Sequence, residues 1–269
     1  SSDNPFIFSL FHDIIDAMKT VAQIVVGLPV DGPFDYRVPE ELRDRIALGH
    51  RVSVPFGPRN MTGYVIGFIA QTHTGTLKRI DRLLEDQPLL SFQQIELSRW
   101  ISAHYGCSLG EAIETILPFS VRKKKTLPLE PSGKAFAAVV LSHQQELFLA
   151  QDSEASMEEI IRRIKRCMNE ERGVLLLAPD RAAADKIYQC LESRLDRPLI
   201  RLDTGTAKAQ TQNWLDARHG LAKCVLGLRS AVFTPLKDLG LAVMFGEHQY
   251  GYQEDQAPFY HARDILVKR

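Results

Sequence analysis

Residues 224–264, CVLGLRSAVFTPLKDLGLAVMFGEHQYGYQEDQAPFYHARD, decide the fold of the second half of the chain. The apolar runs Cys224–Gly227 and Leu239–Phe245 predict two buried strands. The loop between them is basic and carries hydroxyl groups, and the second run leads directly into Gly246-Glu247-His248. A buried strand that ends in an acidic residue is where nucleotide hydrolases hold a magnesium ion. The segment therefore predicts the centre of a nucleotide-hydrolase sheet.

Ahead of this segment, predicted strands and helices alternate. Val174–Pro179 and Leu199–Leu202 are short apolar runs typical of strands. Arg181–Arg194 and Ala207–Arg218 carry apolar residues at helical spacing. Strands that alternate with helices indicate a parallel sheet covered on both faces.

The first half of the chain has a different pattern. Val21–Val30, Arg51–Phe56 and Met61–Ile69 predict short strands that are separated by turn residues. They indicate a small, curved antiparallel sheet or barrel. Two amphipathic helices are predicted after it, at Gln93–His104 and Leu109–Ile116.

The composition allows two hydrophobic cores. The chain has 269 residues, 45% of them hydrophobic, a size at which two domains are the better expectation. Lys plus Arg and Asp plus Glu each number 33, so the net charge is zero and any electrostatic contact with nucleic acid must be local. The four cysteines form no CxxC pair, which argues against a zinc site and fits a reducing cytoplasm.

The second half resembles the first motor lobe of the PriA (primosomal protein N′) family of bacterial replication-restart helicases. Gly227–Phe233 is similar to the family loop GTRSALF, and Tyr260–Asp264 reads YHARD as in the family. The resemblance implies a RecA-like α/β lobe. The acidic box DEEH of the family differs here: Phe245-Gly246 replaces its first Asp-Glu, whereas Glu247-His248 remains.

The first half resembles the DNA-binding domain of the same family. The matching pieces are Phe34–Tyr36, Arg51–Gly57, Leu77–Leu90 and Arg99–Pro118, in the family's order and spacing. The resemblance implies an α+β, barrel-like domain that captures the free 3′ end of a nascent DNA strand.

That resemblance assigns the 3′-end pocket to Phe34, Asp35, Gly57 and Lys78, with Tyr36 beside them. An aromatic ring can stack on a terminal base, a carboxylate can accept from an amine or a terminal hydroxyl, and a lysine can meet a phosphate. Core packing stays open for Phe34 and Tyr36, and a turn role stays open for Asp35.

The phosphate-binding loop of the family is altered. Gln151–Glu159 (QDSEASMEE) aligns without gaps with GVTGSGKTE. Met157 stands in place of the phosphate-binding lysine and Glu158 in place of the magnesium-binding hydroxyl. Side chains thus replace the glycines whose amides approach phosphate, and carboxylates would repel it. The earlier pair Gly133-Lys134 fails the Walker pattern because Ala135 follows it.

The predicted layout has four parts. Residues 1–18 form an N-terminal extension, 19–122 the DNA-binding domain, 123–138 a basic and proline-containing linker, and 139–269 a degenerate RecA-like lobe. The run Arg122–Lys125 suits either phosphate tracking or plain solvation. The chain stops before the family's second motor lobe and zinc-binding cysteines, and its linker has no room for a winged-helix module.

Arg229 and Ser230 are expected to face DNA, because the equivalent loop of related motors touches a strand backbone. The alternative is that Arg229 pairs with a local acid such as Asp238.

We expect a cytoplasmic, nucleoid-associated protein that binds 3′-ended or branched DNA at stalled forks during replication restart. ATPase and helicase activity are not expected, nor are the family's cofactors ATP, magnesium and zinc, and no membrane partner is expected. The alternative is a catalytically inactive scaffold that recruits single-strand-binding or primosome proteins. A pseudogene product is a third possibility.

Overall fold

The computed structural model describes residues 19–70, 75–130, 144–146 and 153–269. The chain divides into two compact units, residues 1–129 and 130–269. The division places residues 123–129, the first part of the expected linker, in the first unit.

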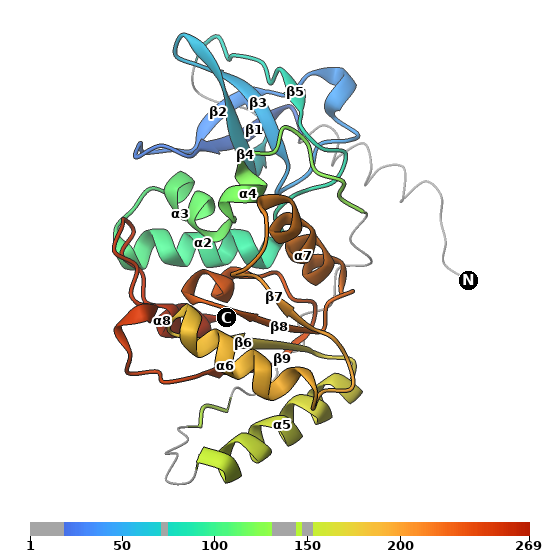
Figure 1. Ribbon diagram of the computed structural model, residues 1–269. Coiled ribbons are helices and arrows are strands. Elements are labelled where there is room, and N and C mark those ends of the chain that lie inside the picture. The colour runs from blue at the N-terminus through green and yellow to red at the C-terminus, as the bar shows by residue number, and fades with distance from the viewer. Residues whose placement is uncertain (1–18, 71–74, 131–143, 147–152) are drawn as a thin grey trace, which may run out of the picture. The chain divides into compact units, whose positions relative to one another are not determined.

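The first unit is built on a five-stranded antiparallel sheet in the order β2-β1-β4-β3-β5 (Figure 1). Its strands are β1 (Val21–Val26), β2 (Phe34–Arg37), β3 (Arg51–Phe56), β4 (Arg59–Ile69) and β5 (Arg82–Leu83). Alternate residues of these strands form one core that includes Ile24, Val52 and Val65. The curved antiparallel sheet expected from the sequence is confirmed.

Two helices pack beside this sheet, α2 (Phe92–Tyr105) and α3 (Leu109–Ile116). Each begins with a capping box, in which a serine side chain and the residue three positions later satisfy each other's backbone amide. A Cβ on Gly110 would lie 1.7 Å from the Val26 carbonyl oxygen, so α3 packs directly on β1. The short helices η1 (Glu40–Leu42) and α4 (Phe119–Arg122) complete the unit.

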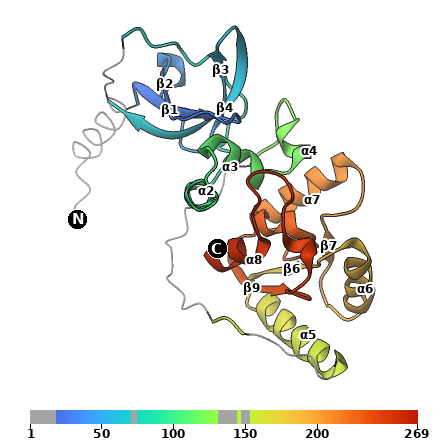
Figure 2. The same ribbon diagram turned by 90° about the vertical axis from the view of Figure 1, so that its left-hand side faces the viewer.

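The second unit is a four-stranded parallel sheet in the order β7-β8-β6-β9 (Figures 1 and 2). Its strands are β6 (Gly173–Leu177), β7 (Leu199–Arg201), β8 (Cys224–Gly227) and β9 (Leu239–Met244). The helices are α5 (Ser153–Asn169), α6 (Arg181–Glu192), α7 (Ala207–His219) and α8 (Ala262–Lys268), with the 3₁₀ segments η2 (Arg229–Phe233) and η3 (Tyr250–Tyr252).

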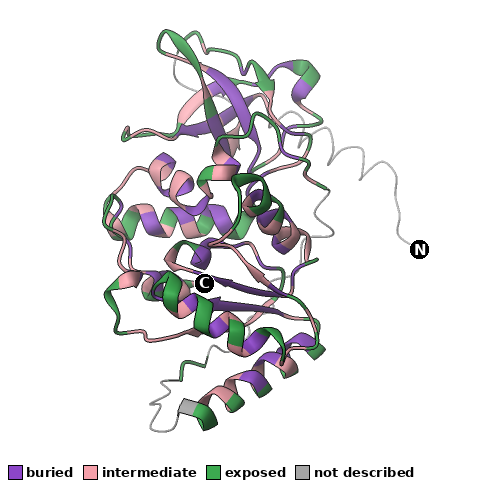
Figure 3. Ribbon diagram, viewed as in Figure 1, coloured by how far each residue is buried: buried purple, intermediate pink, exposed green. Residues whose placement is uncertain are grey.

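Both faces of this sheet are covered, as the alternation of strands and helices predicts. Val174 and Leu176 pack with α5 and α6 in one core. Leu175 and Leu177 point to the opposite face and are also fully buried. The central strands β6 and β8 are drawn as buried in Figure 3. The α/β lobe is therefore confirmed.

Some expected details differ. The strand at 239–245 was expected to be buried, but every residue of β9 is half-buried, because β9 is one of the two outer strands of the sheet that the structure describes. The predicted strand at 147–150, the N-terminal segment 1–18 and the pair Gly133-Lys134 lie outside the described residues.

A buried ion pair sits beneath the first sheet. The guanidinium of Arg51 and the carboxylate of Glu85 are 1% and 0% exposed, and Arg51 Nε lies 3.2 Å from Glu85 Oε2. Arg51 also donates to the carbonyl oxygens of Arg122 (3.5 Å) and Lys124 (3.2 Å). One side chain thus joins β3, the approach to α2 and the end of α4.

We expect Glu85→Ala to lower the free energy of unfolding by about 3–5 kcal/mol, because it leaves a buried cation without its counter-ion. The neighbouring Asp86 pairs with Arg45 on the surface, where both side chains are more than half exposed. Asp86→Ala is therefore the matched control, with an expected loss below about 1 kcal/mol. Urea denaturation measures the free energy of unfolding of both variants. Equal losses would show that burial of the Arg51–Glu85 pair does not contribute to stability.

Candidate nucleic-acid interface

The first unit has an open depression of about 730 Å³ beside the β3–β4 hairpin. It is lined by Pro55, Gly57, Asn60, Lys78, Arg79, Ile80 and Asp81. The structure thus brings together Gly57 and Lys78, two of the residues that the family resemblance assigned to the 3′-end pocket.

Main-chain hydrogen bonds hold the Lys78 side of the depression. Arg37 N–H donates to the Lys78 carbonyl at 2.9 Å, and Ile80 N–H donates to the Arg37 carbonyl at 3.1 Å. Asp81 N–H then donates to the Ser53 carbonyl at 2.9 Å. The segment therefore runs from β2 to β3 with its backbone fixed, and the Lys78 side chain is exposed.

Gly57 forms the opposite rim. It begins the two-residue hairpin loop between Phe56 and Arg59, with φ +60°. Glycine suits this position because other residues adopt positive φ with strain. No atom lies within 4 Å of the place that a Cβ would take, so the space above Gly57 is open.

The two aromatic residues of β2 face the core side of the sheet. Tyr36 is 4% exposed, its hydroxyl donates to the Pro55 carbonyl at 3.1 Å, and burial raises its pKa. Core packing, one of the two interpretations of Tyr36, therefore describes its position. Phe34 is half-buried and meets Phe56 edge-on, with ring centroids 5.2 Å apart. Phe34 thus packs against Phe56, the residue that precedes Gly57.

Asp35 lies on the other face of β2. Successive side chains of a strand point to opposite faces, so its carboxylate points away from the rings of Phe34 and Tyr36. It sits opposite Gln23 on β1 and is half-buried. The turn role considered for Asp35 is wrong, because the residue lies within a paired strand.

In the second unit, Arg229 is held by an acid that the sequence analysis did not identify. Its Nε lies 3.2 Å from Glu254 Oε2, and its second amino nitrogen lies 3.0 Å from Glu254 Oε1. The expected local partner, Asp238, was therefore wrong, although the ion-pair alternative itself holds. Ser230 is exposed at the start of η2.

The residues aligned with the phosphate-binding loop have structural partners. Gln151 and Asp152 lie outside the described residues. Met157 packs against the core beneath the sheet, and Glu158 forms an ion pair with Arg194. Both lie in α5, which begins at Ser153. Neither position offers a cation or a hydroxyl to a phosphate.

Glu247, which remains from the acidic box of the family, is also held by an ion pair. Glu247 lies 2.5 Å from the Arg263 guanidinium, and His248 is exposed. The buried Tyr252 hydroxyl lies 2.8 Å from the Leu177 carbonyl oxygen and 2.6 Å from that of Phe245. Tyr252 therefore ties together the carboxyl ends of β6 and β9.

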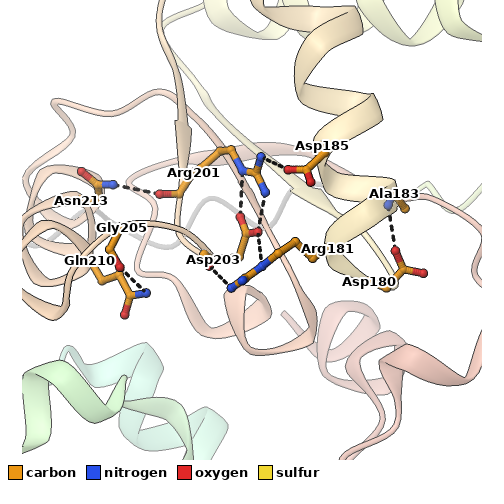
Figure 4. Close-up of polar contacts among 9 residues, drawn as sticks. All are labelled: Asp180, Arg181, Ala183, Asp185, Arg201, Asp203, Gly205, Gln210 and Asn213. Carbon is orange, nitrogen blue, oxygen red and sulfur yellow. Dashed lines mark hydrogen bonds and ion pairs between the residues drawn. The ribbon is translucent and has the colours of Figure 1, made fainter.

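A polar network at the carboxyl ends of β6 and β7 was not anticipated (Figure 4). Arg201 binds Asp203 through two nitrogens, at 3.0 and 2.5 Å, and reaches Asp185 at 2.5 Å. These carboxylates raise the pKa of Arg201. Arg181 donates to the Asp203 carbonyl at 2.9 Å. The positive charge of Arg201 is therefore balanced within the unit. Only the short spacing of Arg201 and Asp203 could have suggested this pairing.

Over the residues that the structure describes, no group of three His, Cys, Asp or Glu side chains could hold a metal ion. All four cysteines are free thiols, and burial raises the pKa of Cys224 to about 12. No described helix is both long and apolar enough to cross a membrane.

Comparison with known proteins agrees with this geometry. Residues 23–118 match the family model of the 3′DNA-binding domain (3′BD) of PriA. The match begins within β1 and contains β2 to β5, α2, α3 and all the residues that line the depression.

The chain is similar to PriA proteins over most of its length. It is 27% identical to replication restart protein PriA of Treponema pallidum over 92% of the chain, and 28% identical to the probable PriA of Mycobacterium tuberculosis over 89%. PriA of Rickettsia felis is 26% identical over 93%. The chain spans about two fifths of the length of these relatives, 40–41%.

The Arg229–Glu254 pair generates a prediction for salt-dependent DNA binding. We expect Arg229→Ala to leave the slope of log affinity against log salt unchanged, because its guanidinium is already paired. Glu254→Gln should release the guanidinium and steepen the slope by up to about one. Fluorescence anisotropy with labelled DNA at several salt concentrations measures the slope for both variants. A slope that falls by about one in Arg229→Ala would instead make Arg229 a phosphate contact.

Proposed function

We propose that this chain binds 3′-ended or branched DNA through its first unit during replication restart, and that it does so without hydrolysing ATP. The supporting observation is the depression that contains Gly57 and Lys78 inside a domain that matches the 3′BD family. In this role the protein acts in the cytoplasm at the nucleoid.

The chemistry of the depression suits a strand terminus. Lys78 supplies a cation on a fixed backbone, which can meet the last phosphate. Gly57 leaves open space for a nucleotide to approach the main chain. The half-buried ring of Phe34 lies behind Phe56 and would have to present its remaining face to a base. Asp35 would read the terminus from the outer face of the edge strand β2.

The absence of ATP hydrolysis rests on the partners of the altered motifs. Met157 supports the core and Glu158 holds Arg194, so neither fits a triphosphate with its magnesium ion. Gly246 adopts φ +61°, and a Cβ there would lie 2.5 Å from the Gln249 amide nitrogen. The proposal therefore assigns no nucleotide step to this lobe.

A second candidate function is a scaffold that recruits single-strand-binding or primosome proteins. The observation that favours it is the exposure of Tyr250 and Phe259, which are 77% and 59% accessible in the second unit. Aromatic side chains of this kind are enriched where proteins dock.

For the DNA-binding proposal, we expect Asp35→Ala to lose discrimination between a free 3′-hydroxyl end and a 3′-phosphate-blocked end. The loss should correspond to about 1–3 kcal/mol, the cost of removing one hydrogen-bond partner. Lys78→Ala should weaken binding to both ends equally, because a phosphate contact carries no information about the terminus. Competition binding with matched fork DNAs measures both effects.

Asp31→Ala is the matched control, since Asp31 is an exposed acid outside the strand that carries Asp35. It should keep full discrimination. If Asp35→Ala discriminates as the parent protein does, with circular dichroism unchanged, the 3′-end proposal fails at this residue and the scaffold becomes the better explanation.

We also expect phosphate release from ATP to stay at the background rate, with and without single-stranded DNA. The double variant Met157→Lys, Glu158→Thr should remain inactive. It should also be less stable, because it places a cation against the core and breaks the pair with Arg194. DNA-stimulated phosphate release by the purified parent protein, in a coupled assay, would refute the prediction.

A further inference from the structure

The first unit carries a second surface suited to nucleic acid, outside the depression. Phe119 is 65% exposed at the start of α4, and Lys123, Lys124 and Lys125 that follow it are exposed. We call these four residues the Phe119–Lys125 patch. None of the three lysines forms an ion pair with a residue that the structure describes. Lys123 Nζ lies 5.3 Å from the centre of the Phe119 ring.

The backbone of the patch is fixed. The buried guanidinium of Arg51 donates to the carbonyl oxygens of Arg122 and Lys124. The Arg122 side chain lies 3.0 Å from Glu114 Oε2, and Leu127 is buried just beyond the lysines. The lysines therefore project from an anchored segment, which reduces the conformational entropy that binding would remove.

The combination of groups points to single-stranded DNA. Exposed lysines meet phosphates, and an exposed aromatic ring stacks on unpaired bases. The cations at the carboxyl edge of the second unit are different, since Arg201, Arg229 and Arg263 are each paired with carboxylates. The patch therefore combines cations without ion pairs to described residues, a ring that is mostly exposed and an anchored backbone.

We propose that the Phe119–Lys125 patch binds single-stranded DNA on the 5′ side of a terminus held in the depression. This proposal rests on the proposed function of the first unit. It adds a second contact that the 3′-end pocket does not contain.

The geometry of β3 gives the spacing of the two contacts. Arg51, which anchors the patch, begins the six-residue strand, and Phe56 ends it next to Gly57. The strand is about 17 Å long at about 3.4 Å per residue. With stacked nucleotides about 3.4 Å apart, a strand reaches from one contact to the other in roughly five nucleotides. Figure 1 shows α4 beneath the five-stranded sheet.

The test measures how affinity depends on the length of single-stranded DNA with a free 3′ end. The triple variant Lys123→Ala, Lys124→Ala, Lys125→Ala should bind oligonucleotides of about four nucleotides as the full parent chain does. For oligonucleotides of about twelve nucleotides, the affinity of this variant should fall at least ten-fold. The slope of its log affinity against log salt should fall by about two, at roughly 0.7 per phosphate contact. Phe119→Ala should lower the affinity about five-fold, and only for the longer oligonucleotides.

Matched variants control for folding and for charge. Phe92 is 64% exposed on α2 in the same unit, so Phe92→Ala should bind as the parent does. Replacing the three lysines by arginine should keep the salt slope. If the triple alanine variant binds long and short oligonucleotides as the parent does, the patch is not a DNA contact.

Three further outcomes are decisive. A loss seen only with fully duplex DNA would replace the single-strand proposal by a duplex contact. If the 3′-end pocket fails while the patch is real, a blocked 3′ end would bind as a free end does, yet the length dependence would persist. Failure of the patch alone would remove the length dependence and leave discrimination of the 3′ end intact.

Discussion

The buried Arg51–Glu85 ion pair is the constraint on which the first unit depends. Removing two charges from water costs several kcal/mol per ion, and the cost is offset only when the remaining hydrogen-bond donors find partners. Arg51 meets this requirement by donating to Glu85 and to two main-chain carbonyls near the end of the unit. The Arg51 side chain therefore couples the stability of the sheet to that of the approach to α2 and of the basic segment after α4.

Although the net charge of the chain is zero, the two units differ in how their cations are paired. In the second unit, cations at the edge of the parallel sheet neutralise nearby carboxylates, as Arg201 does with Asp203. In the first unit, Lys78 and the lysines after α4 are exposed on fixed backbone segments. Local arrangement, and not total charge, decides where a polyanion is attracted.

Local signals in the sequence predicted most elements of both units. Period-two alternation identified β3, and apolar spacing identified α3 with the bounds that the structure shows. The partners of charged residues could not be predicted, because Arg51 and Glu85 are 34 residues apart and Arg229 and Glu254 are 25 apart. Such pairings depend on how strands and loops return to one another in space.

The conformation of Gly57 has a consequence for chemical labelling. Its φ of +60° strains ordinary L side chains through handedness, whereas the open space above it sets no limit on volume. A mirror-image amino acid prefers positive φ, so D-alanine would fit this corner without strain. A D-residue that carries a photoreactive group could therefore be introduced at the rim of the depression by peptide ligation, and it would report on whatever molecule enters there.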